Sequence, residues 1–217
     1  MIQNQDRMFR RIMMSVVGVL ICGVGVGLFK FAAFGVDPFQ SLMGGLAAVL
    51  PVSFGLLYIL VNAVLLLFSV IFDRSKIGIA TFINLFLLGY VVDFTHQSML
   101  AALPGASMAV RIAVLAAALP ILSFSCSMYF VADLGVSTYD AMALVFNQKC
   151  PKIPFKFWRV MTDFICVGLG VGLFLLSGKP MSDIGVVAGV GTIITAFCMG
   201  PFIEFFNVHV SEPILNR

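Results

Sequence analysis

Asp163 is the ionisable residue of this chain best placed to do chemistry, because it lies about two turns inside a long apolar segment. Arg159 precedes it by four residues, and side chains at that spacing share one face of a helix. An ionised side chain in such a segment is costly unless it is paired or hydrated, so it marks a candidate functional site. Two interpretations stay open: a substrate or proton site, and an intrahelical ion pair that anchors the helix.

A second set of polar side chains follows two Gly-Val pairs. Asp37 and Gln40 come after Gly35-Val36, and Asp140 comes after Gly135-Val136. If a helix starts at each place, its free N–H groups and its dipole stabilise a carboxylate, so capping is the plain interpretation. The alternative is that these helix starts face a cavity and bind an anionic group of a substrate.

The elements that carry these residues belong to a membrane protein. Of the 217 residues, 61% are hydrophobic and only 11% are charged, against about 25% charged residues in a typical soluble domain. Six apolar stretches each approach the roughly 20 residues that a helix needs to cross a bilayer core of about 30 Å. They predict an all-α polytopic protein with six transmembrane helices, at 12–33, 52–72, 77–94, 112–132, 157–176 and 184–206.

Two shorter helices are predicted between these spans. Pro38 suits the first turn of a helix, and Pro51 discourages its continuation. The enclosed helix, 38–50, would be about 20 Å long, which is too short to cross a membrane. Residues 138–149 follow the second Gly-Val pair in the same way. Both are expected to be half-helices, either re-entrant or interfacial.

The chain also contains an internal repeat. A shift of 100 residues aligns the two Gly-Val pairs, and a shift of 101 aligns Asn62 with Asp163. At a shift of 111, small and polar residues match without a gap: Gly78, Thr81, Gly89 and Asp93 fall on Gly189, Thr192, Gly200 and Glu204.

The repeat divides the chain into 1–106 and 107–217, each with three spans and one half-helix. An odd number of crossings makes the second copy enter from the opposite side, so the copies have inverted topology. Inverted repeats with broken helices are frequent in secondary transporters, whose sites lie where the halves meet.

The repeat adds further candidates to the site. Asn62 shares the predicted depth of Asp163, which favours a polar pair across the pseudo-two-fold axis. Thr81 and Thr192 lie on faces of small residues, which we interpret mainly as packing faces and keep as candidate substrate contacts. Asp93 and Glu204 are expected to close the third and sixth spans, with a gating or structural role. Trp158 and the tyrosines are expected at the membrane interfaces.

The basic residues predict an orientation, because Lys and Arg favour cytoplasmic loops. With six spans, Arg217 and three clusters fall on one side of the membrane: Arg7, Arg10 and Arg11; Arg74 and Lys76; and Lys149, Lys152, Lys156 and Arg159. Only Lys30, Arg111 and Lys179 fall on the other side. Both termini are therefore expected to be cytoplasmic.

Four motifs resemble the YczE/YyaS/YitT group of bacterial membrane proteins over nearly the whole chain. They are Gly-Val-Asp-Pro-Phe at 35–39, Gly-Val-Ser-Thr-Tyr-Asp at 135–140, Phe-Lys-Phe-Trp-Arg with Asp at 155–163, and Gly-x-Gly-Thr with Gly-Pro and Glu at 189–204. The resemblance implies a bacterial inner membrane and little about chemistry. The first turn departs from the pattern, since Asp37-Pro38 stands where the second copy has Ser137-Thr138. This leaves open whether Asp37 belongs to a shared site.

Three functions stay open. The first is a secondary transporter or permease for a small solute that binds between the repeats. The second is the substrate-binding membrane subunit of a multicomponent transporter, in which a partner would supply the ATPase because this chain has no phosphate-binding Gly-rich loop. The third is a non-catalytic membrane assembly factor.

Other classes are not expected. No hydrolase or metalloprotease motif occurs, so no enzyme is predicted. The five cysteines lack metal-ligand spacing, so neither a metal nor a cofactor is predicted. The basic residues follow topology, which excludes a nucleic-acid partner. The expected partners are the lipid bilayer and an unidentified small solute, and a homo-oligomer or a partner subunit stays open.

Overall fold

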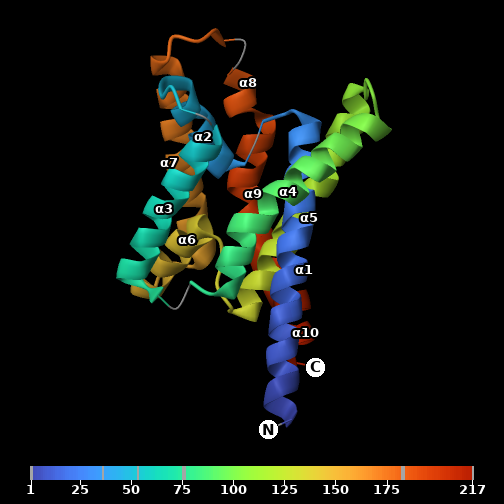
Figure 1. Cartoon of the computed structure of the whole chain (residues 1–217), viewed down its shortest axis with the longest axis vertical. Helices are drawn as coiled ribbons and strands as arrows, with labels where there is room; N and C mark the ends of the chain where they lie inside the picture. Colours follow the sequence, from blue (N-terminus) through green and yellow to red (C-terminus); the bar gives the residue numbers. More distant parts are fainter. Residues whose placement is uncertain (1, 36, 53, 75–76, 182–183, 217) are drawn as a thin grey trace.

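The computed structural model describes residues 2–35, 37–52, 54–74, 77–181 and 184–216 (Figure 1). The regular secondary structure among these residues is all helical, and no strand occurs among them. The helices are α1 (Ile2–Ala32), α2 (Pro38–Val49), α3 (Phe54–Phe72), α4 (Ile79–Ala102), α5 (Met108–Ala132), α6 (Thr138–Lys149), α7 (Phe155–Leu176), α8 (Ile184–Val187), α9 (Val190–Phe206) and α10 (Glu212–Asn216). A π-helical turn, Asn207–Ser211, joins α9 to α10.

Four helices are long and apolar enough to cross a membrane: Arg7–Ala32, Met108–Ala132, Phe155–Leu176 and Val190–Asn216. They overlap four of the six predicted spans, although the last predicted span, 184–206, begins in the separate short helix α8. The other two, 52–72 and 77–94, lie in α3 and α4, and the described part of α3 includes a shorter apolar helix, Ile59–Phe72. The chain is thus an all-helical membrane protein, and the count of six spans stays a prediction.

The described helices form two packed groups, seen side by side in Figure 1. In the first, which we call the half-helix bundle, α2 packs on α3 and α7, and α6 packs on α3 and α7. In the second, the long-helix bundle, α1 packs along α4 and α5, and α5 packs on α9. The contact of α7 with α9 joins the bundles.

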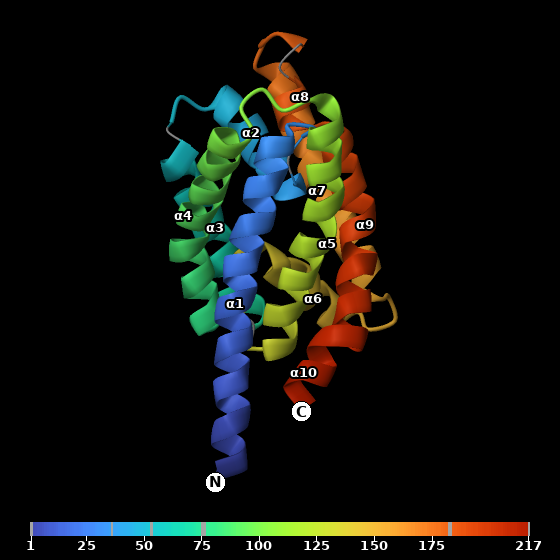
Figure 2. The same ribbon diagram turned by 90° about the vertical axis from the view of Figure 1, so that its right-hand side faces the viewer.

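The short helices α2 and α6 match the predicted half-helices to within one residue. They lie toward opposite ends of the molecule, with α6 nearer the end that holds both termini (Figures 1 and 2). α2 crosses α7 very closely, since a Cβ atom added at Gly45 would lie 2.2 Å from the carbonyl oxygen of Gly170. Such small-residue crossings are typical of helix packing in membranes.

The turns before α2 and α6 have nearly the same backbone geometry. Gly35 has a φ of 106° and Gly135 a φ of 103°, a region that favours glycine, and each follows another residue of positive φ, Ala33 at 57° or Asp133 at 51°. This geometry ends the preceding long helix and turns the chain sharply into the half-helix.

Each turn is bonded to the start of a helix in the other predicted repeat. The carbonyl of Phe34 accepts from the N–H of Gly191 at 2.8 Å, and the carbonyl of Leu134 accepts from the N–H of Ala80 at 3.0 Å. Because of these reciprocal contacts, segments 1–106 and 107–217 interlock within one body.

The helix that carries Asp93 continues past the predicted end of the third span. The third predicted span ends at residue 94, whereas α4 continues to Ala102, because the first proline or glycine after Gly89 is Pro104. The Asp93 side chain is 75% exposed and pairs with Lys30 Nζ at 3.6 Å. Glu204 lies near the end of α9 and pairs with Lys156 Nζ at 3.8 Å, but the helical course continues beyond it to Asn216.

Candidate functional site

A polar cavity of about 80 Å³ lies between the two bundles. The half-helix bundle and its turns contribute the charged lining, Asp37, Asp140 and Arg159, together with Gln40 and Asn62. The long-helix bundle contributes mainly apolar and weakly polar groups: Cys22, Val26, Asn84, Leu88, Leu122, Cys126, Tyr129 and Met199. The starts of both half-helices therefore face one shared cavity.

The centre of the site is an ion pair between Arg159 Nη1 and Asp140 Oδ1. Both residues are buried, with 4% and 3% of their surface exposed. The second carboxylate oxygen of Asp140 accepts from the hydroxyl of Tyr129, across the gap between the bundles, and from Ser137 Oγ at 2.5 Å. The Asp140 carboxylate thus accepts hydrogen bonds from one charged donor and two neutral donors.

Capping is confirmed for Asp37 and wrong for Asp140. Oδ1 of Asp37 accepts from the N–H groups of Phe39 and Gln40, both at 3.1 Å, and caps α2. At α6 the cap is Ser137, whose Oγ accepts from the N–H of Asp140 at 3.0 Å. Because Ser137 takes over the capping, the Asp140 carboxylate is left to pair with Arg159.

Asp163 lies behind the cavity, outside its lining. The predicted pair with Arg159 is confirmed, since Arg159 Nε lies 3.4 Å from Asp163 Oδ1, although this contact lacks hydrogen-bond geometry. The hydroxyl of Tyr139 donates to the same oxygen, and Oδ2 has no hydrogen-bond partner among the described residues. Asp163 therefore acts on the cavity through Arg159 and Tyr139.

Aromatic rings bring the two half-helix starts together. The rings of Phe39 and Tyr139, which align in the predicted repeat, stack with centroids 5.2 Å apart. The guanidinium of Arg159 lies 4.7 Å from the centroid of the Tyr139 ring, within the range of a cation–π contact. Asn62 joins the cluster by accepting from Thr138 Oγ1 at 2.6 Å.

Thr81 and Thr192 lie at the starts of the two helices that contact the turns. Thr81 Oγ1 donates to the carbonyl of Val136 at 2.7 Å and accepts from the N–H of Gly78 at 3.2 Å. Thr192 is fully buried and accepts from the N–H of Gly189 at 3.2 Å. Neither lines the cavity, and neither do Asp93 and Glu204. These four predicted positions are therefore not gathered with the others.

Sequence reasoning missed two tyrosines, and it counted Arg159 both as a candidate site residue and as an orientation charge. Tyr129 and Tyr139 were expected at the membrane interface, but they are 2% and 7% exposed and bind the carboxylates. Arg159 was counted among the orientation charges, but it is buried in the site. The pairing of Tyr139 with Phe39 in the repeat was the available signal, because both follow a Gly-Val turn at the same distance.

The site is electrostatically unbalanced. Arg159 is the only basic side chain among the described residues that line the cavity, and it faces three acidic ones: Asp37 and Asp140 in the lining and Asp163 behind it. Among the described residues, no group of three His, Cys, Asp or Glu side chains is placed to hold a metal ion. With every group ionised, the site carries an excess of negative charge.

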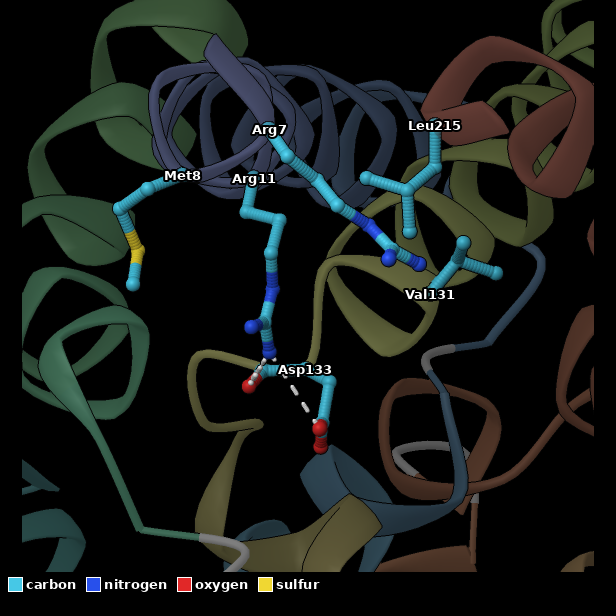
Figure 3. A pocket seen from close by; sticks show the side chains of 6 residues that line it. All are labelled: Arg7, Met8, Arg11, Val131, Asp133 and Leu215. Carbon is cyan, nitrogen blue, oxygen red and sulfur yellow. Dashed lines mark hydrogen bonds and ion pairs between the residues drawn. The ribbon is translucent and has the colours of Figure 1, made fainter. Parts of the chain in front are cut away.

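A second pocket, of about 380 Å³, lies where α1, α5 and the C-terminal helix meet (Figure 3). Arg11 projects into it and donates to the carbonyls of Ala132 and Asp133, both at 2.6 Å. These bonds satisfy carbonyls that the end of α5 leaves without helical partners. Arg11 is therefore a helix cap, and this pocket lacks the buried acidic cluster of the first.

Residues 9–208 match a family described as a family of unknown function, DUF6198. The chain belongs to this family. Every residue that lines the polar cavity falls within the part that matches DUF6198.

Two relatives of this DUF6198 protein come from Bacillus subtilis (strain 168). The uncharacterized protein YyaS is 22% identical over 93% of this chain and 92% of its own length. The uncharacterized membrane protein YczE is 25% identical over 92% of this chain and 86% of its own length. Both agree with the resemblance carried by the four motifs. No solved structure matches this chain.

Proposed function

We propose that this chain is a secondary transporter or permease for a small solute, which binds in the polar cavity between the two bundles. The observation that carries the proposal is the meeting of both half-helix starts at one buried cavity that holds Asp37, Asp140 and Arg159. Half-helices whose N-termini converge on a shared site are the recurrent plan of secondary transporters.

The proposal includes two inverted-topology repeats, 1–106 and 107–217, with six spans in all. The reciprocal bonds of the two turns support this reading, because Phe34 binds Gly191 as Leu134 binds Ala80. The location of α2 and α6 toward opposite ends supports it as well (Figures 1 and 2).

The proposed location is the bacterial inner membrane, with both termini cytoplasmic. Both termini lie at one end of the molecule, and Arg7, Arg10 and Arg11 lie near that end on α1 (Figure 2). Even when the buried Arg159 is not counted, most basic residues fall on the side predicted to be cytoplasmic. No catalytic residue is proposed, because the site binds and neutralises charge without a motif for bond cleavage.

The proposed motion is a rocking of the half-helix bundle against the long-helix bundle around the cavity. Tyr129 of α5 and Asp140 of α6 would break and remake their hydrogen bond during this motion, since they lie on opposite bundles. Arg159 and Asp140 would move together, because α6 and α7 pack within one bundle.

The test is solute flux in proteoliposomes that contain the purified protein, with an imposed ion or proton gradient and a panel of small solutes. Wild-type flux is expected to depend on the gradient. Tyr129→Phe should change the rate of flux while solute binding persists, because the bond between the bundles is lost together with a bond to Cys126 Sγ on the same helix. Ser98→Ala is the control, since it removes a hydroxyl from an exposed position of α4 that lines neither the cavity nor any other pocket described.

Two outcomes would contradict the proposal. Flux that survives collapse of the gradient, together with an ATPase that co-purifies, would favour the substrate-binding subunit. Absence of binding and flux across the whole panel would favour the assembly factor.

A further inference from the structure

An apolar groove of about 580 Å³ separates α3 from α4, on the side where the two bundles are apart. Its lining is largely aliphatic and aromatic: Ile59, Ala63, Leu66, Phe82, Leu85, Phe86, Gly89 and Tyr90, with Asn62, Thr81, Thr138 and Asp93. Ile59, Phe86 and Tyr90 are 61%, 70% and 78% exposed. In a membrane, side chains exposed to this degree on apolar helices face lipid.

The groove adjoins the polar cavity. Asn62 and Thr138 line both spaces, and they are bonded to each other at 2.6 Å. A molecule that lies along α3 and α4 would therefore meet the charged cluster at its inner end. A route from the lipid to a buried polar site suits a substrate with one apolar and one polar part.

The charge of the buried cluster indicates which polar group the substrate carries. Arg159 is outnumbered by Asp37, Asp140 and Asp163, and buried carboxylates are stable only when paired, hydrogen-bonded or neutralised. One buried acceptor, Asp163 Oδ2, also lacks a hydrogen-bond partner among the described residues. The described lining of the groove contains no basic residue, and its one acidic side chain, Asp93, is paired with Lys30. A cation therefore complements the cavity, and an apolar chain complements the groove.

We propose that the substrate is a cationic amphiphile, with a small ammonium head in the cavity and an alkyl chain in the groove between α3 and α4. The cavity is large enough for such a head group. Its volume of about 80 Å³ exceeds the roughly 10–15 Å³ that one water requires. This inference rests on the proposed substrate role of the cavity and adds the substrate class and the lateral route.

The experiment measures binding in phosphatidylcholine vesicles through Trp158, the sole tryptophan of the chain, which precedes Arg159. The probes are decyltrimethylammonium, tetramethylammonium and decyl sulfate, so that tail and charge vary separately. Decyltrimethylammonium is expected to saturate the signal at a concentration about tenfold or more below either of the others. Decyl sulfate binding as tightly as the cation would overturn the charge assignment.

One pair of variants tests where the probe binds. Gly89→Phe fills the groove, and it should fold because a Cβ atom there meets nothing within 4 Å. It is expected to abolish the advantage of the tailed cation over tetramethylammonium. Gly168→Phe is the matched control, because a Cβ atom at Gly168 on α7 also meets nothing within 4 Å and lies outside the groove. Equal binding by both variants would overturn the groove assignment.

Asp37→Asn tests the head group separately. Asn is as good a helix cap as Asp, so α2 should remain capped while one negative charge is lost. Affinity for decyltrimethylammonium is expected to fall by about tenfold, the size of a hydrogen bond or contact to a charged group. Unchanged affinity would contradict a cation in this cavity.

The outcomes separate this inference from the proposed function. Saturable, groove-dependent binding of the cation without flux would reject transport and keep the site. Gradient-driven flux of an anionic solute with no binding of the cation would keep transport and reject this substrate class. A loss of dimer mass in Gly89→Phe with unchanged cation binding would assign the groove to a second copy of the chain and overturn the inference.

Discussion

The two halves of the protein share their backbone plan and divide the chemistry between them. α7 carries Arg159 and Asp163 and packs against α9, whereas the aligned helix α3 carries Asn62 and is separated from α4 by the groove. The second half therefore supplies Arg159, Asp140 and Asp163, whereas the first half supplies Asp37 and an opening between the bundles. In the proposed transporter, this opening would give access to the charged cavity.

The two turns differ in the same way. In the first, Asp37 is itself the cap of α2, and the position aligned with Asp140 is Gln40. In the second, Ser137 caps α6, and Asp140 is free to pair with Arg159. The ion pair of the site thus depends on two differences between the turns, the capping residue at 37 and 137 and the residue at 40 and 140.

The largest expected effect comes from removing the cation of the second half. Arg159→Met leaves the buried Asp140 and Asp163 without their counter-charge, so unfolding free energy should fall by about 3–5 kcal/mol. Thermal unfolding of the purified protein in detergent measures the loss. Lys156→Met is the control, because its pair with Glu204 is exposed and should contribute at most about 1 kcal/mol. Equal losses in both variants would refute a structural ion pair at Arg159.

Replacing each of the two turn glycines by alanine tests whether the two turns contribute equally to the unfolding free energy. Gly35→Ala and Gly135→Ala each force a side chain into a positive φ, with a Cβ atom 2.6 Å or 2.4 Å from the backbone of the opposite repeat. Each should cost about 1–3 kcal/mol in unfolding free energy. Gly168→Ala, in open space, serves as the reference. A cost at only one of the two turns would break their structural equivalence.

Asp163→Asn makes the second half resemble the first. The amide still accepts from Tyr139, so the protein should fold with a loss of about 1 kcal/mol or less, while gradient-dependent flux is expected to fall strongly. Flux in proteoliposomes and thermal unfolding measure the two effects separately. If flux is retained while stability falls by several kcal/mol, Asp163 is only an anchor for α7.

The smallest effect concerns the caps. Ser137→Ala removes the cap of α6 and a donor to Asp140, so it should cost about 1 kcal/mol, with an upper limit near 2 kcal/mol. Asp37→Asn retains its cap and should change stability by a few tenths of a kcal/mol. Thermal melts of both variants give the comparison. A larger loss in Asp37→Asn would mean that its charge, in addition to its cap, stabilises the fold.

Local signals accounted for the helices and part of the site. Pro38 and the Gly-Val turns gave the bounds of α2 and α6, because proline and glycine act on the backbone of their own neighbours. The spacing of Arg159 and Asp163 gave their contact for the same reason. The helix α4 continues beyond Phe94, where the third predicted span ends, since loss of hydropathy does not end a helix that lacks a breaker.

The sequence by itself determined a membrane protein of long apolar helices, two short ones and a candidate acid–base pair, since each follows from residues near one another in the chain. Only the tertiary structure decided that Asp140 is the partner at the centre, that Tyr129 reaches it from the other bundle, and that α3 leaves a groove where α7 packs tightly. The physical reason is that a buried charge is stabilised by whichever donors the fold brings to it. Those donors lie on different helices, and no pattern among neighbouring residues predicts how closely they approach the charge.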